Sequence, residues 1–167
     1  MCPTTTHPPL IRKASLADAP TVLRLVVALA DYEHLPPPDA DAQERLIRDM
    51  TGDRPKIDGY LAEVEGLAVG YAFVMETYSS FLALPTLYLE DLFVLPEFRS
   101  RKVGAALFTA MVREAHQRGC GRMEWTVLDW NQLAIDFYRR LGARHMQEWH
   151  LYRLVREDME RILGATT

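Results

Sequence analysis

Residues 87–106 read LYLEDLFVLPEFRSRKVGAA, and this stretch decides the fold. The apolar run Leu87–Leu95 predicts a buried strand, which Pro96 ends. From Val103 to about Gly119, small and apolar residues recur at helical spacing. A buried strand, a basic turn and a helix in this order predict a crossover connection, so part of the sheet is parallel.

Upstream of this stretch, the pattern predicts one strand, two helices and an antiparallel hairpin. The helices carry amphipathic apolar stripes, and the hairpin turns at Glu65-Gly66. Residues 79–85 are expected to form a loop. The expected elements are a strand at 10–13, helices at about 18–34 and 40–50, and strands at 60–64 and 68–76.

Downstream, the pattern predicts a strand at 123–128 and a short helix that opens at Asn131 and ends at Gly142. Two further strands are expected near 144–147 and 149–155, followed by a short polar helix. Helical crossovers imply parallel pairing and the hairpin implies antiparallel pairing. The whole pattern therefore predicts a mixed α/β sheet.

Composition restricts the class of protein. The chain has 167 residues, 49% of them hydrophobic and 25% charged, which is typical of one soluble globular domain. We expect a flexible tail at 1–9 and one domain at 10–167. The net charge of −4 argues against general binding to nucleic acid or to an anionic membrane. The N-terminus lacks the pattern of a signal peptide and Cys2 and Cys120 make no disulfide framework, so we expect a cytoplasmic protein.

The basic turn has the features of an anion-binding site. Arg99, Arg101 and Lys102 precede a helix whose first backbone N–H groups are unpaired. Ser100 and the small residues Gly104 and Ala105 let a ligand approach the backbone. Phosphate or pyrophosphate is the natural ligand of such a site. The alternative is a solvated basic turn before an ordinary surface helix.

The segment Arg99-Ser-Arg-Lys-Val-Gly-Ala105 resembles the acetyl-CoA pyrophosphate loop of the GCN5-related N-acetyltransferase (GNAT) superfamily. Lys102 stands where that family's pattern has its first glycine. The segment from Trp130 to Ala143 resembles the family's later Asn-to-Gly helix. Tyr88–Val94 and Tyr32-Glu33 resemble the diamine (spermidine/spermine-type) and thialysine acetyltransferase branch. The resemblance covers residues from about 10 to about 154.

This resemblance implies a GNAT-like α/β fold, a single domain with a mixed, largely antiparallel central sheet flanked by helices. It also implies an N-acetyltransferase that uses acetyl-CoA as cosubstrate, needs no metal and forms a homodimer. Pantetheine would pair with the backbone of the buried strand. The residues that it implies for cofactor binding are Leu92, Phe93, Val94, Arg99, Ser100, Arg101, Lys102, Val103, Gly104, Ala105, Asn131 and Tyr138.

Acetyl transfer to an amine needs a neutral amine, and alkyl ammonium groups have a pKa near ~10. A base therefore helps, and the departing thiolate gains from an acid. We assign Glu90 as the base, because burial in its strand would raise its pKa, and Tyr138 as the acid. Glu90 and Asp91 alternate along a strand, so only one faces the cleft unless a bulge intervenes. Two structural alternatives remain: Tyr138 as a core tyrosine and Asn131 as a helix cap.

The acceptor is expected to be a small-molecule amine. Tyr32, Glu33, Glu90 and Asp91 could form its acidic, partly aromatic pocket, although the acids near Glu33 could also be a solvated helix end. The loop Ser79–Thr86 lacks the acidic and Trp residues of the diamine enzymes. A smaller amine or a lysine-like amino acid therefore fits better than spermine.

Two other functions stay open from the sequence. The first is a catalytically silent acyl-CoA sensor or interaction module on the same fold, which Tyr138 and Glu90 argue against. The second is a nucleotide-dependent phosphotransferase that uses the basic loop. The chain lacks the Gly-x4-Gly-Lys-Ser/Thr phosphate loop that this second function would require.

Overall fold

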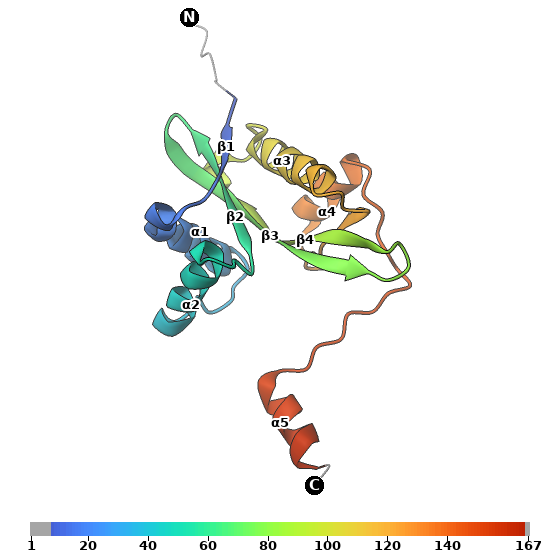
Figure 1. The fold of residues 1–167 in the computed structure, drawn as a ribbon. Coiled ribbons are helices and arrows are strands. Elements are labelled where there is room, and N and C mark those ends of the chain that lie inside the picture. Colours follow the sequence, from blue (N-terminus) through green and yellow to red (C-terminus); the bar gives the residue numbers. More distant parts are fainter. Residues whose placement is uncertain (1–7, 166–167) are drawn as a thin grey trace, which may run out of the picture. The chain divides into compact units, whose positions relative to one another are not determined.

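A computed structural model describes residues 8–165, in two compact units at 8–126 and 127–165 (Figure 1). Residues 1–7 of the expected tail lie outside the described residues. Within the described residues, no helix is long and apolar enough to cross a membrane.

The first unit is built on a five-stranded sheet in the order β1-β2-β3-β4-β5. The first four strands pair antiparallel, and β5 pairs parallel to β4. This confirms the predicted mixed, largely antiparallel sheet. The strands are β1 (Leu10–Lys13), β2 (Asp58–Val64), β3 (Leu67–Ser79), β4 (Leu84–Val94) and β5 (Arg122–Glu124).

Three helices and two short 3₁₀ turns complete this unit. Ser15 and Asp18 form a capping box around the first 3₁₀ turn, and the Asp39 side chain accepts a hydrogen bond from Ala42 N to cap α2. The elements are η1 (Leu16–Asp18), α1 (Ala19–Tyr32), α2 (Ala40–Thr51), η2 (Pro96–Phe98) and α3 (Val103–Gln117).

The two faces of the sheet are covered by different helices. On one face, α1 and α2 bury Val22, Leu25 and Met50 in a cluster with Tyr71 and Phe93 of the sheet (Figure 1). On α3, the apolar stripe that the sequence predicts is buried. Its buried residues are Val103, Leu107, Phe108, Met111 and Ala115.

The hairpin turn is confirmed where the sequence predicted it. Glu65 and Gly66 both have positive φ, +52° and +80°, which is the geometry of a tight turn that matches the twist of its strands. The next connection is shorter than the expected loop at 79–85. β3 continues to Ser79 and β4 begins at Leu84, and Ser79 Oγ accepts a hydrogen bond from Leu82 N at 3.2 Å.

The second unit holds α4 (Gln132–Arg140) and α5 (Arg156–Gly164). The helix expected after Asn131 and the final polar helix are both confirmed. The strands expected near 144–147 and 149–155 are wrong, because these residues carry no strand pairing and Trp149 and Tyr152 are exposed. Alternating apolar residues make a strand only where a neighbouring strand accepts their hydrogen bonds. The expected strand at 123–128 is likewise shorter, at Arg122–Glu124.

Arg118, just after α3, ties this helix to the sheet. Its guanidinium lies 2.8 Å from Asp58 of β2 and 2.8 Å from Glu114 of α3, and only 19% of its side chain is exposed. Lys13 of β1 reaches the same Asp58 carboxylate at 2.6 Å. The cluster therefore joins β1, β2 and α3 at one end of the sheet.

We expect Arg118→Ala to lower the free energy of unfolding by about 2–3 kcal/mol, because Asp58 and Glu114 lose a largely buried partner. Urea unfolding measures this loss. Arg48→Ala is the matched control, since Arg48 pairs with Asp49 at the surface with 62% of its side chain exposed. Such a pair is worth less than about 1 kcal/mol. Equal losses in the two variants would contradict the assigned role of the cluster.

Candidate functional site

Strand β4 contains a bulge at Glu90. In the β3–β4 register, Phe73 pairs with Asp91 and the next residue of β3, Val74, pairs with Leu89. Glu90 is therefore an extra residue in β4. A bulge of this kind bends its strand and redirects the residues beside it. The exception that the sequence analysis allowed to strict alternation is thus present at the pair of acids.

The bulge sets which backbone groups reach the edge of β4. Leu95 N donates to Val69 O of β3 at 2.9 Å, and antiparallel bonding alternates, so Phe93 also bonds toward β3. The N–H and C=O groups of Leu92 and Val94 consequently face the opposite edge. Within residues 8–126, β5 covers that edge only at residues 86–88 of β4.

The loop between β4 and α3 contains two residues in the left-handed backbone conformation that glycine adopts most readily. Ser100 and Lys102 have φ of +64° and +62°, and α3 begins at Val103 directly after them. Lys102 therefore takes the left-handed conformation at the position where the resembling pattern has glycine. The first N–H groups of α3 have no partner within the helix and no side-chain cap, and Lys102 adds a cationic side chain at this end.

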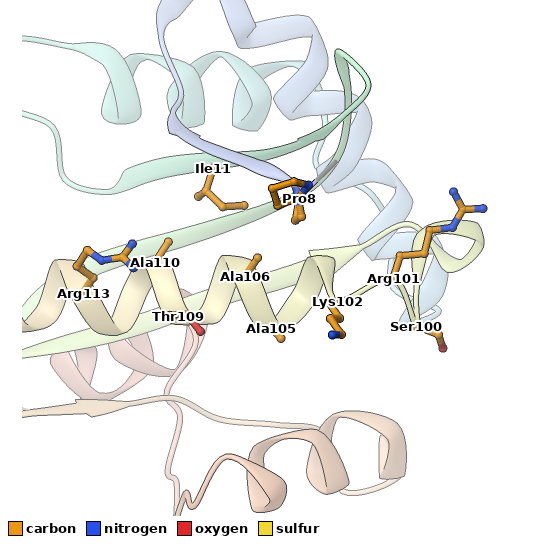
Figure 2. A pocket seen from close by; sticks show the side chains of 11 residues that line it. Pro8, Ile11, Ser100, Arg101, Lys102, Ala105, Ala106, Thr109, Ala110 and Arg113 are labelled. Atoms are coloured by element: carbon orange, nitrogen blue, oxygen red, sulfur yellow. The ribbon is translucent and has the colours of Figure 1, made fainter. Parts of the chain in front are cut away.

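A groove of about 1020 Å³ runs along this loop and α3 (Figure 2). Figure 2 shows that Ala106 and Ala110 point toward Ile11 of β1, whereas Lys102 points away from β1. The lining is therefore small and apolar toward β1 and cationic at the loop. Its residues are Pro8, Pro9, Ile11, Ser100, Arg101, Lys102, Ala105, Ala106, Thr109, Ala110 and Arg113.

Arg99 does not line this groove. Its Nε donates to Val94 O at 3.0 Å, and its guanidinium lies 4.3 Å from the ring centroid of Tyr32 at the end of α1. This distance is typical of a cation–π contact. Arg99 therefore links the loop before α3 to Tyr32, a residue that the sequence analysis assigned to the acceptor pocket.

Asp91, and not Glu90, is the more buried acid of the pair. Glu90 is exposed, so the expectation that its strand buries it is wrong. The reason is the bulge, which presents the extra residue to solvent. Burial raises the pKa of Asp91 to about 6, a hydrogen bond from Tyr71 opposes that rise, and the charges of Glu90 and Glu33 add to it.

Glu33 and Tyr32, which the sequence assigned to the acceptor pocket, lie near Asp91 on the face of the sheet that α1 covers. Burial also raises the pKa of Glu33, at the C-terminal end of α1, and its charge acts on Asp91. Tyr32 packs on Phe93, with ring centroids 6.2 Å apart. Within the described residues, neither Asp91 nor Glu33 has a Lys, Arg or His within salt-bridge distance. The structure thus gathers carboxylates without a cation.

Tyr71 was missed by the sequence analysis. Its hydroxyl donates to Asp91 Oδ2 at 2.9 Å from a fully buried ring. Inside a strand of apolar residues, a tyrosine has no pattern that separates it from the other core residues. Only the pairing of β3 with β4 brings it to Asp91.

The second unit carries the other predicted site residues. The Asn131 side chain accepts a hydrogen bond from Ala134 N at 3.2 Å, so Asn131 is a helix cap, the structural alternative left open for it. Tyr138 lies on α4, its ring 5.2 Å from that of Phe137, and burial raises its pKa to about 12. The Tyr138 phenol therefore keeps its proton at neutral pH.

We expect Asp91→Asn to stabilise the protein at pH 8. The folded-state pKa of about 6 lies above the ordinary value of 3.8, so the native state loses stability as pH rises from 3.8 to about 6, and the loss is complete above that range. Asparagine removes this loss, worth up to about 3 kcal/mol, and can still accept the Tyr71 bond. Melting temperatures at pH 4 and pH 8 measure it, with the gain confined to pH 8.

The exposed Asp31→Asn variant is the control and should change stability by less than about 0.5 kcal/mol at either pH. A lower melting temperature for Asp91→Asn at pH 8 would mean that the carboxylate stabilises the fold. That result would contradict the assignment of Asp91 as a charge held at the expense of stability.

Comparison with known proteins identifies the family. Residues 24–143 match the model of the acetyltransferase (GNAT) family. The chain is 33% identical over 166 residues to the thialysine N-epsilon-acetyltransferase of Sus scrofa, covering 93% of this chain and 97% of that protein. It is 34% identical over 163 residues to the human spermidine/spermine N(1)-acetyltransferase-like protein 1, covering 89% of this chain and 23% of that protein.

Solved structures agree on the fold. An aminoglycoside N-acetyltransferase solved with CoA superposes with a TM-score of 0.74 at 24% identity, covering 92% of this chain and 99% of that chain. An integron cassette protein from V. cholerae superposes with a TM-score of 0.78 at 19% identity, covering 94% and 98%. With the family match and the sequence relatives, this shows that the chain belongs to the acetyltransferase (GNAT) family and is an N-acetyltransferase.

Proposed function

We propose that this enzyme transfers the acetyl group of acetyl-CoA directly to a primary amine of a small molecule, a short diamine or a lysine-like amino acid. The observation that carries the proposal is Asp91, a largely buried carboxylate with no cationic partner among the described residues. An ammonium group of the acceptor would supply the missing positive charge. Relatives named for thialysine, L-ornithine and spermidine/spermine acetylation support an amine of this class.

The cofactor would bind along the edge of β4 and at the start of α3. The N–H and C=O groups of Leu92 and the N–H of Val94 face the open edge and can pair with the amides of the pantetheine arm as another strand would, whereas Val94 O already accepts from Arg99. The N–H groups at the start of α3 and the side chain of Lys102 suit the pyrophosphate. Gly104 lies beside Val94, and a Cβ at position 104 would meet the valine side chain only at the ordinary contact distance of 3.8 Å.

We propose a supporting role for Arg99, in addition to the cofactor contact that the resemblance implies. With its Nε on Val94 O and its guanidinium over Tyr32, it supports the wall between the cofactor edge and the acceptor pocket. Ser100, Arg101 and Lys102 line the groove and carry the contact with phosphate. Phe93 contributes its buried side chain, 3% exposed, as the floor of the acceptor face.

The acceptor pocket would use Tyr32, Glu33 and Asp91, with Glu90 at its exposed rim. The ammonium group first binds as a cation between carboxylates. Glu90, open to solvent at the bulge, takes its proton through water and leaves a neutral amine that attacks the thioester carbonyl. Tyr138, which its raised pKa keeps protonated at neutral pH, then gives its proton to the departing thiolate. No covalent acyl-enzyme and no metal take part.

We further propose that the enzyme works as a cytoplasmic homodimer without a nucleic-acid or membrane partner. The family resemblance supports the dimer. The net charge of −4 gives no general attraction to nucleic acid or anionic membranes. The free thiol of Cys120 is compatible with a reducing compartment such as the cytoplasm.

A panel of amines with acetyl-CoA, read by thiol release, tests the proposed acceptor. We expect short diamines or lysine-like amino acids to exceed spermine in kcat/KM by roughly fivefold or more, because spermine's further cations meet no carboxylate in the turn after β3. That turn carries Phe81, which is 97% exposed, and no acid. A higher kcat/KM for spermine would contradict the acceptor class, and no turnover with any amine would favour an acyl-CoA sensor.

Tyr138→Phe tests the acid. Phenylalanine keeps the ring and removes the hydroxyl, so kcat should fall by about 10²–10⁴. Binding of CoA, measured by calorimetry, should survive. Tyr78→Phe is the matched control, since Tyr78 is 68% exposed on β3 and should leave kcat unchanged. An unchanged kcat for Tyr138→Phe would contradict the catalytic role and leave Tyr138 as a structural core residue.

A further inference from the structure

We propose that Tyr71 is a positioning residue that holds Asp91 as an ionised, correctly oriented carboxylate for the acceptor's ammonium group. This inference rests on the proposed function and adds a residue to it. Neither the sequence pattern nor the family resemblance singled out Tyr71. Tyr71 and Asp91 share a hydrogen bond, both side chains are largely shielded from water, and the bond favours the ionised form of Asp91.

The bond joins side chains of two neighbouring strands that pair with each other. Tyr71 and Asp91 project from neighbouring strands on the same face, and Tyr71 Oη donates to Asp91 Oδ2 at 2.9 Å. The Tyr71 ring is held by Phe73, with centroids 4.9 Å apart in an edge-to-face arrangement, and by Phe93 at 6.3 Å. The donor therefore sits in a rigid aromatic setting.

The phenol can only donate in this pair. Burial and the charge of Asp91 raise the pKa of Tyr71 far above its ordinary value, so its proton stays on oxygen. Within the described residues, Tyr71 is the hydrogen-bond partner of the Asp91 carboxyl. One carboxylate oxygen is thus taken by the phenol, and the other remains for the acceptor.

The bond counteracts the other groups around Asp91. Burial and the negative charges of Glu33, from the end of α1, and Glu90, from β4, all favour the protonated acid. Tyr71, from β3, is the group that favours the carboxylate. The guanidinium of Arg99 lies over the rings of Tyr32 and Phe93, and among the described residues it forms no salt bridge with Asp91. Without Tyr71, the Asp91 carboxyl would take up its proton at higher pH and lose its charge toward the ammonium.

The test compares Tyr71→Phe with the wild-type enzyme across pH. Phenylalanine keeps the ring contacts and removes the donor, so the acidic limb of kcat/KM for the amine should move up by about one pH unit. The amine KM near pH 6.5 should rise severalfold, whereas the acetyl-CoA KM should stay the same. When Tyr71→Phe is added to the Asp91→Asn variant, the pH profile should be the same as that of Asp91→Asn alone.

Tyr60→Phe is the matched control. Tyr60 is also a buried tyrosine of the sheet, 8% exposed, and its hydroxyl accepts a hydrogen bond from Arg118 Nη2 at 3.4 Å, away from Asp91. Its loss should leave the acidic limb unchanged. An equal shift in Tyr60→Phe would mean that the limb reports general loosening of the sheet, and would overturn the proposal.

A direct titration makes the inference independent of turnover. The ¹³Cγ resonance of Asp91, followed against pH in the free protein, should show a higher midpoint in Tyr71→Phe than in wild type. If Tyr71→Phe does not fold, 3-fluorotyrosine at position 71 keeps the hydroxyl as a stronger donor and should lower the midpoint. An unchanged midpoint would overturn the role of Tyr71 even in an active enzyme. A shifted midpoint in an enzyme that acetylates no amine would leave the pair intact and contradict the proposed function instead.

Discussion

Glu90 is an extra residue in β4, and backbone groups alternate along a strand, so this one residue exchanges the edges that the following amides face. Before it, β4 pairs with β5 on its outer edge. After it, Leu92 and Val94 direct their N–H and C=O groups outward with no strand of the first unit beside them. The same bulge places Asp91 under α1 and Glu90 in solvent. The proposed cofactor edge and the proposed acceptor face therefore both depend on this one bulge.

The two sides of the sheet serve different ends. At Arg118, opposite charges are paired across β1, β2 and α3, and this favours stability. At Asp91, the described part of the chain gathers carboxylates with no cation in salt-bridge contact, and this opposes stability at neutral pH. Under the proposed function, the ammonium group of the acceptor compensates this charge. Arg99 links the edge of β4 to the end of α1, because it donates a hydrogen bond to Val94 O and its guanidinium lies over the Tyr32 ring.

Much of this could be predicted from the sequence, because hydrophobic periodicity and turn residues act locally. The strand-loop-helix from Leu87 onward and the turn at Glu65-Gly66 carry their signals within a few residues. The buried member of the acid pair could not be predicted, because the bulge depends on the register with β3. The contact between Tyr71 and Asp91 could not be predicted either, because it depends on the same register. The strands expected at 144–155 failed because alternation does not supply a pairing partner.

The central claim is that the edge of β4 beyond the bulge receives the cofactor's backbone-like arm. Amide hydrogen exchange, measured residue by residue with and without acetyl-CoA, tests it most directly. We predict that acetyl-CoA slows exchange at Leu92 and Val94 by about tenfold or more, while Phe93, already bonded to β3, changes little. Equal protection along the whole strand, or none at Leu92 and Val94, would contradict the account.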